Sequence, residues 1–339
     1  PLNVTVHIDP DAAMVDLDLR DNIDNLDCGL NESEACVGAS TFAGVFNSID
    51  PTVPRNSGSF RRVRLHLRDG CVAGRPKFPH SCSVATTNVA DRLINIVQSA
   101  VAEIGEGFGL AEGGIGMGAY AAVISGHDHR HGDEAYVNQL VAGSSGGPAS
   151  PVADGWVTYG IPVVAGLMYR DSIEVDELKH PMEFHYLRLA DGTGGAGRFR
   201  GAPGMEISYG PKESPMDVIW PTDGTINVPK GVRGGRDGAG CLHFKVGANG
   251  HAEELGGLAI LRLAKGEVVT GRACGGGGYG SPLEREPRRV LRDVLEHYET
   301  PERARDIYGV VLTGAVEDES LAVDMAATRA RRAELTAAG

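Results

Sequence analysis

The chain has 339 residues, 42% apolar side chains and a net charge of −13, which predicts a folded protein with a substantial core and argues against nucleic acid as a partner. Its 48 glycines and few aromatic residues favour turns and strands over a helical bundle. The sequence has no stretch of roughly 18 continuous apolar residues and opens with no signal peptide, so we expect no membrane association. The six cysteines form no CxxC pair, and we expect reduced thiols and a cytoplasmic location.

The first third of the chain predicts a hairpin, two helices and a strand. Apolar and polar residues alternate from Asn3 to Arg20, as in a β-hairpin. Small residues recur at spacings of three and four from Ser33 to Asn47, which predicts a helix packed closely on a neighbour. A strand is expected over Arg61–Arg68, and the strongest helical pattern covers Val89–Ile104, with Asn88 as its N-cap.

The remainder is predicted to be mainly strand and turn until its last fifth. Glycine and proline punctuate residues 126–240, where Pro181–Leu189 is the clearest strand, and strands continue through residues 258–274. Three C-terminal helices are expected over Pro287–Tyr298, Pro301–Tyr308 and Glu319–Leu335.

These elements predict an α+β fold with mixed, largely antiparallel sheets, one long buried helix and a helical C-terminus. We expect an α+β core over residues 1–125, a β-rich and glycine-rich region over residues 126–282, and C-terminal helices over residues 283–339.

Two glycine-rich motifs raise the question of phosphate binding. Residues 113–119 (GGIGMGA) contain the letters of a dinucleotide-binding fingerprint, but a helix precedes them and a His-rich segment follows, which is not a βαβ context. The run Gly275–Gly278 could converge its amides on a phosphate. Because Glu284 and Glu286 would place negative charge beside such a ligand, we favour a structural role in close backbone packing, on the way from the last strand to the C-terminal helices.

A histidine cluster is a candidate metal site. His127, His129 and His131 would share one face of an extended segment, where imidazoles can bind Zn²⁺ or Mn²⁺. The flanking glycines and charges indicate an exposed loop instead, and we favour that interpretation.

A second group of polar residues could line a cleft between the first hairpin and the long helix. An alternative is that the asparagines form turns and the charges lie at a helix start in solvent. The candidate cleft residues are Asn31, Asn56, Arg61, His80, Asp91 and Arg92.

Several stretches, taken in order along nearly the whole chain, resemble the hydantoinase B/oxoprolinase family, which includes subunits of N-methylhydantoinase, oxoprolinase and the acetone and acetophenone carboxylases. The stretches are MVDLDLRDN, VPRNSGSFRRVRLHLRDG, NVADRLINIVQSAVAEI, HPMEFHYLRLADGTGGAGRFRGAPG, GVRGGRDGAG, RACGGGGYGSPLERE, VLRDV, ARDIYGVVL and VDMAATRARRAEL.

The resemblance implies a subunit of an ATP-dependent cyclic-amide hydrolase. A partner subunit of the hydantoinase A type, carrying ATP and Mg²⁺, would phosphorylate a small-molecule substrate, and the B-type part would support attack by water. The resemblance also implies that a Zn, Mn or Fe ion is bound by an N-terminal hydantoinase B-like portion that precedes the hairpin, so no metal ligands are expected in this chain. The alternatives are a subunit of a ketone carboxylase of the acetone or acetophenone type, and a non-catalytic assembly subunit.

Overall fold

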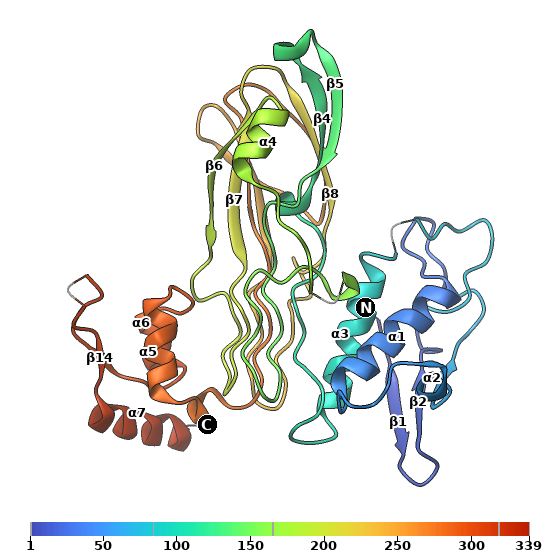
Figure 1. The fold of residues 1–339 in the computed structure, drawn as a ribbon, viewed down its shortest axis with the longest axis vertical. Coiled ribbons are helices and arrows are strands. Elements are labelled where there is room, and N and C mark those ends of the chain that lie inside the picture. The colour runs from blue at the N-terminus through green and yellow to red at the C-terminus, as the bar shows by residue number, and fades with distance from the viewer. Residues whose placement is uncertain (1, 84, 165, 318, 339) are drawn as a thin grey trace.

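The computed structural model describes residues 2–338 except residues 84, 165 and 318. Figure 1 shows an N-terminal lobe in blue and cyan, tall central strands in green to amber, and a group of helices in orange and red. The architecture is α+β with largely antiparallel sheets and a helical C-terminus, as predicted. None of the helices in the described ranges is long and apolar enough to cross a membrane.

The N-terminal lobe (residues 2–104) packs two helices on a three-stranded sheet. The predicted hairpin is formed by β1 (Thr5–Asp9) and β2 (Met14–Asp18), and β3 (Val63–His66) pairs in parallel with β2. The helices of the lobe are α1 (Glu34–Ser48), the short α2 (Ser57–Phe60) and α3 (Val89–Ala102).

The two long helices of this lobe cross at close range. A Cβ atom added at Gly44 of α1 would lie 2.6 Å from the Cβ of Val97 on α3, which confirms the predicted close packing of the small residues. The predicted N-cap of α3 is wrong in one respect. Asn88 has α-region backbone angles, and its carboxamide accepts a hydrogen bond from Thr87 at 3.0 Å instead of capping a helix amide.

Two antiparallel sheets share the main hydrophobic core. The five-stranded sheet has the order β10-β9-β12-β7-β6, and the four-stranded sheet has the order β11-β8-β4-β5. Trp220, Ile124 and Leu263 of the second sheet pack in one buried cluster with Ile207 and Tyr209 of the first. The strands are β4 (Val123–Asp128), β5 (Glu134–Gln139), β6 (Met182–Leu189), β7 (Met205–Pro211), β8 (Met216–Pro221), β9 (Leu242–Val246), β10 (Ala252–Glu254), β11 (Leu258–Leu263) and β12 (Val268–Arg272), with helix α4 (Ile173–Lys179) before β6.

Below these sheets, glycine-rich segments run as extended chains that belong to no regular sheet (Figure 1). We call them the glycine-rich bundle, which comprises residues 111–115, 144–149, 192–203, 228–240 and 273–280. The four amides of Gly275–Gly278 donate in turn to the carbonyl oxygens of Ala239, Ala202, Glu112 and Arg236, at 2.8–3.0 Å. These acceptors lie in three other segments of the bundle, and the amide of Ala149 in the fourth donates to the carbonyl oxygen of Gly277 at 3.0 Å.

This arrangement decides between the two interpretations of the glycine run. All four amides already donate to backbone carbonyls, so none remains to bind a phosphate. A Cβ at Gly276 would overlap the carbonyl oxygen of Gly147, and one at Gly277 would overlap that of Lys230. Close backbone packing is confirmed, although the run is an extended segment within a bundle rather than a turn.

Three helices and a short hairpin complete the chain. They are α5 (Pro287–Leu295), α6 (Pro301–Asp306), β13 (Leu312–Thr313), β14 (Ala322–Val323) and α7 (Met325–Ala338). The last helix begins six residues after the predicted start at Glu319. The reason is that residues 322–323 pair with β13, and the carboxylate of Asp324 then accepts from the amides of Ala326 and Ala327, where the helix begins.

Candidate functional site

A cleft of about 810 Å³ lies where the three parts of the molecule meet. The N-terminal lobe contributes Asn47, Arg55 and Gln98, the central region contributes residues 153–157, and Tyr298 comes from the C-terminal helices. A cavity of this size, lined by parts distant in sequence, is typical of a small-molecule site.

The wall of the cleft combines aromatic rings with one unpaired carboxamide oxygen. Trp156 is 55% exposed, while Tyr159 is buried, which raises the pKa of its hydroxyl. Gln98 is 3% exposed, and its Oε1 has no hydrogen-bond partner among the described residues. A buried carboxamide oxygen without a partner is costly, so a ligand with an N–H or O–H donor would satisfy it.

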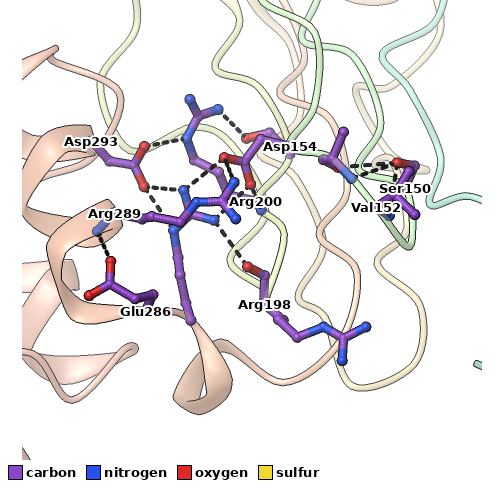
Figure 2. Close-up of polar contacts among 11 residues, drawn as sticks. Ser150, Val152, Asp154, Arg198, Arg200, Glu286, Arg289 and Asp293 are labelled. Carbon is purple, nitrogen blue, oxygen red and sulfur yellow. Dashed lines mark hydrogen bonds and ion pairs between the residues drawn. The ribbon is translucent and has the colours of Figure 1, made fainter.

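A cluster of ion pairs borders the cleft (Figure 2). Arg285 is almost fully buried and binds Asp154 through two nitrogens at 2.7 and 2.9 Å, and Asp293 at 2.7 Å. Arg200 also donates to Asp293 at 2.9 Å, and Arg289 donates to Asp154 at 2.6 Å. These contacts connect α5 to the segments that line the cleft.

The cluster gives this side of the cleft a net positive charge, because three guanidinium groups face two carboxylates. Burial by itself would raise the pKa of Asp154, but its hydrogen bonds to Arg285 and the charges of Arg200 and Arg289 hold that pKa below its ordinary value. Asp154 is therefore ionised and fully engaged near neutral pH. The cluster can orient a polar or anionic ligand, and it is not a proton donor or acceptor.

The predicted residues Asn56, Arg61 and His80 lie on the N-terminal lobe. Asn56 is the N-cap of α2 and accepts from the amides of Gly58 and Ser59 at 2.9 and 3.3 Å. Arg61 follows α2 and is exposed, and His80 Nδ1 lies 3.2 Å from the carboxylate of Asp27. None of the three lines the 810 Å³ cleft, although Arg55, next to Asn56, does.

Asp91 and Arg92 are neighbours in α3 whose side chains have different partners. The carboxylate of Asp91 accepts from the amide of Val163 at 2.8 Å, while Arg92 reaches Glu112 at 3.2 Å and Asp223 at 2.9 Å. Arg92 thus joins the N-terminal lobe to the central region. Whether these side chains contact a substrate stays a prediction.

The sequence did not point to Glu32, which lies in the same interior as Asp91. Asn31 beside it fastens a loop by donating to carbonyls of Leu26, Cys28 and Ser81. Glu32 accepts from Ser40 at 2.9 Å, and burial raises its pKa to about 7. Burial likewise raises the pKa of Asp91 to about 8, and the charge of Glu32 contributes to that shift.

Both acids have one carboxylate oxygen without a hydrogen-bond partner in the described structure. Acids that titrate near neutral pH are concentrated at functional sites, but these two are fully buried and do not line the cleft. Tyr159 lines the cleft, and the charge of Asp91 contributes to the raised pKa of its hydroxyl.

The three candidate histidines do not share one face. His127 is in β4, whereas His129 and His131 form a 3-10 turn, which breaks the period-two pattern. His129 lies 3.0 Å from the hydroxyl of Ser214, and the neighbouring Asp128 is held by Arg130. Across the described residues, no group of three or more His, Cys, Asp or Glu side chains is placed to hold a metal ion.

Comparison with known proteins identifies the family. The sequence model of hydantoinase B/oxoprolinase matches residues 1–282. The chain belongs to the hydantoinase B/oxoprolinase family.

Two curated relatives of this chain are subunits of larger enzymes. It is 31% identical over 300 residues to the caprolactamase subunit beta of Pseudomonas jessenii, which covers 85% of the chain and 49% of that subunit. It is 24% identical over 308 residues to the acetophenone carboxylase delta subunit of Aromatoleum aromaticum, which covers 78% of the chain and 43% of that subunit.

The fold agrees with a crystal structure of the ATP-dependent caprolactamase from Pseudomonas jessenii. The TM-score is 0.82 at 26% identity, over 98% of this chain and 56% of the caprolactamase chain. The chain thus spans about half the length of the relatives it matches.

Proposed function

We propose that this chain is part of an ATP-dependent enzyme that hydrolyses cyclic amides. The observation that carries the proposal is its 31% identity to a caprolactamase subunit over most of the chain, together with a TM-score of 0.82 to an ATP-dependent caprolactamase. Hydrolysis of an unactivated amide is slow, and phosphorylation of the amide oxygen divides it into two easier steps.

In this proposal, different parts of the enzyme carry out different steps. A hydantoinase A-like subunit binds ATP and Mg²⁺ and activates the small-molecule substrate. An N-terminal hydantoinase B-like portion binds the Zn, Mn or Fe ion. Among the residues that the structure describes, no group of His, Cys, Asp or Glu side chains is placed to hold a metal ion, so no step through a metal is assigned to them.

Within this division, the chain positions the substrate. The cleft supplies aromatic surface at Trp156 and an unpaired carboxamide at Gln98, beside a positively charged ion-pair cluster. Asn56, Arg61, His80, Asp91 and Arg92 are proposed to support this site from the N-terminal lobe. We also propose a cytoplasmic location, in which the six free cysteines would stay reduced.

A ketone carboxylase is the second candidate, because the acetophenone carboxylase delta subunit is also a relative. The two reactions differ in the nucleophile, which is water in the hydrolase and an enolate in the carboxylase. In a third candidate, the chain is an assembly subunit without chemistry.

The test is to purify the native complex, identify its chains, and measure phosphate release from ATP. Cyclic amides are expected to stimulate turnover, whereas ketone plus bicarbonate would do so if the complex is a carboxylase. Absence of an A-type ATPase from the complex would overturn both enzyme proposals.

The predicted site residues are tested in the same assay. Arg61→Ala is expected to lower turnover at least about tenfold if Arg61 supports the site, and Asn56→Ala is expected to do likewise. Arg62→Ala is the matched control, since Arg62 is the adjacent exposed arginine. Equal kinetics for Arg61→Ala and Arg62→Ala would remove Arg61 from the site.

A further inference from the structure

Two cysteines that the proposed function does not use meet beneath the paired strands β9 and β12. Cys241 precedes β9 and Cys274 follows β12, and these strands pair antiparallel with Leu242 opposite Arg272. Both cysteines are buried. A Cβ atom added at Gly224 would overlap Cys274 Sγ and would lie 3.9 Å from Cys241 Sγ, so the two sulfur atoms come together at Gly224.

Both thiols contact backbone carbonyl groups of one short segment, Asp223 and Gly224. Cys241 Sγ donates to the carbonyl oxygen of Asp223 at 3.2 Å, and Cys274 Sγ lies 3.9 Å from the carbonyl oxygen of Gly224. The neighbouring thiol of Cys274 lowers the pKa of the Cys241 thiol, and His243 adds to this effect. The pKa of Cys274 is raised by the same contact and by burial.

His243 provides a base at this place. It lies two residues beyond Cys241 in the same strand direction, so the two side chains point to the same face. Its ring is fully buried against Trp220, with centroids 5.2 Å apart, and neither ring nitrogen has a hydrogen-bond partner of good geometry among the described residues. An unpaired buried imidazole beside a thiol can accept the thiol proton.

We propose that Cys241 and Cys274 form a reversible dithiol–disulfide site that reacts with small hydroperoxides. His243 takes the proton of Cys241, and the thiolate attacks a peroxide oxygen. The O–O bond breaks, water leaves with the proton returned by His243, and Cys241 becomes a sulfenic acid. The thiol of Cys274 then attacks the sulfenic sulfur, the S–S bond forms, the S–O bond breaks, and hydroxide leaves as water with the proton of Cys274.

The balance is two thiols plus one hydrogen peroxide giving one disulfide and two waters. Hydrogen peroxide accepts the two electrons, and a dithiol reductant such as dithiothreitol reverses the reaction. Because hydrogen peroxide is small and uncharged, local opening of the buried site is sufficient for its access.

Oxidation would act on the connection between the N-terminal lobe and the central region. The disulfide lacks both thiol hydrogens, so the hydrogen bonds to the carbonyls of Asp223 and Gly224 are lost. The carboxylate of Asp223 is the acceptor for Arg92 of α3 at 2.9 Å. The site therefore couples thiol oxidation to this ion pair.

The experiment treats the reduced chain with hydrogen peroxide, alkylates it with N-ethylmaleimide in denaturant, and maps its peptides by mass spectrometry. We expect a cross-linked peptide pair containing Cys241 and Cys274, lighter by two hydrogens, that dithiothreitol restores. Cys28 is the internal control for thiol reactivity, because it is exposed. Migration as a monomer on a non-reducing gel distinguishes the intramolecular link from a link between chains.

His243→Asn is expected to slow formation of the link at least tenfold while alkylation of Cys28 is unchanged. Full alkylation of Cys241 and Cys274 under conditions that oxidise Cys28 would overturn the proposal. A trapped sulfenic acid on Cys241 without any link to Cys274 would overturn it as well. The wild-type measurement decides this even if the His243 variant does not fold.

Discussion

Buried acids show at the level of single residues how the interior of the N-terminal lobe responds to pH. The pKa of Asp91 is raised from 3.8 to about 8 and that of Glu32 from 4.5 to about 7, in both cases chiefly by burial. The folded chain therefore binds more protons than the unfolded chain between about pH 4 and pH 8. Stability is expected to fall as pH rises through this window, because the slope follows the difference in bound protons.

Asp91→Asn is expected to remove most of this loss. Asparagine cannot ionise, and its carboxamide oxygen can still accept from the amide of Val163. The variant should be more stable than the wild type by about 5 kcal/mol at pH 8, since the pKa of Asp91 rises from 3.8 to about 8 and each pKa unit corresponds to about 1.4 kcal/mol, and should differ little at pH 4. Urea denaturation at both pH values measures the difference.

The control for this prediction is Glu253→Gln, which changes an exposed acid of β10. It should leave stability unchanged at both pH values. A destabilised Asp91→Asn variant at pH 8 would mean that the folded protein uses the charge of Asp91, which would contradict a neutral buried acid.

Close backbone packing in the glycine-rich bundle stabilises the central region. Its extended segments have their amides bonded to distant backbone, and the space between them is too small for side chains. Gly276→Ala is expected to destabilise the protein by at least about 3 kcal/mol, because its methyl group would overlap the carbonyl of Gly147 and force the surrounding backbone apart.

Gly256→Ala is the matched control, because no atom lies within 4 Å of the added Cβ. It should change the free energy of unfolding by less than about 1 kcal/mol. The denaturation midpoints of the two variants measure the difference in stability. Similar midpoints would show that the backbone around Gly276 can move apart to accommodate a methyl group.

Local patterns predicted the helices and strands, but not this bundle or the buried acids. The 3.6-residue period located α1 and α3 to within two residues, since each presents one apolar face to a neighbour. The glycine-rich segments carry no period, because their partners are backbone carbonyls far away in the sequence. The proximity of Glu32 to Asp91 likewise depends on tertiary packing across more than 50 residues.

Arg92 links the N-terminal lobe to the central region of the molecule. Its guanidinium group connects α3 to Glu112, which is nearly buried, to Asp223, and to the carbonyl oxygen of Asn227 at 2.8 Å. Glu112 belongs to the glycine-rich bundle, and its carbonyl accepts from Gly277. Arg92 thus connects the N-terminal lobe with the centre of the bundle. It is also one of the residues that the proposed function places in support of the substrate site.

Arg92→Ala is expected to loosen the N-terminal lobe rather than the whole molecule. Removing the guanidinium leaves the carboxylate of Glu112 buried without its cation, which costs about 3–5 kcal/mol. Hydrogen exchange should therefore speed up in α1 and α3, while β7 and β12 keep their protection. Arg262→Ala, which removes an exposed ion pair with Asp217, should cost less than about 1 kcal/mol and leave exchange unchanged. Unchanged exchange in α3 of Arg92→Ala would mean that apolar packing alone holds the lobe in place.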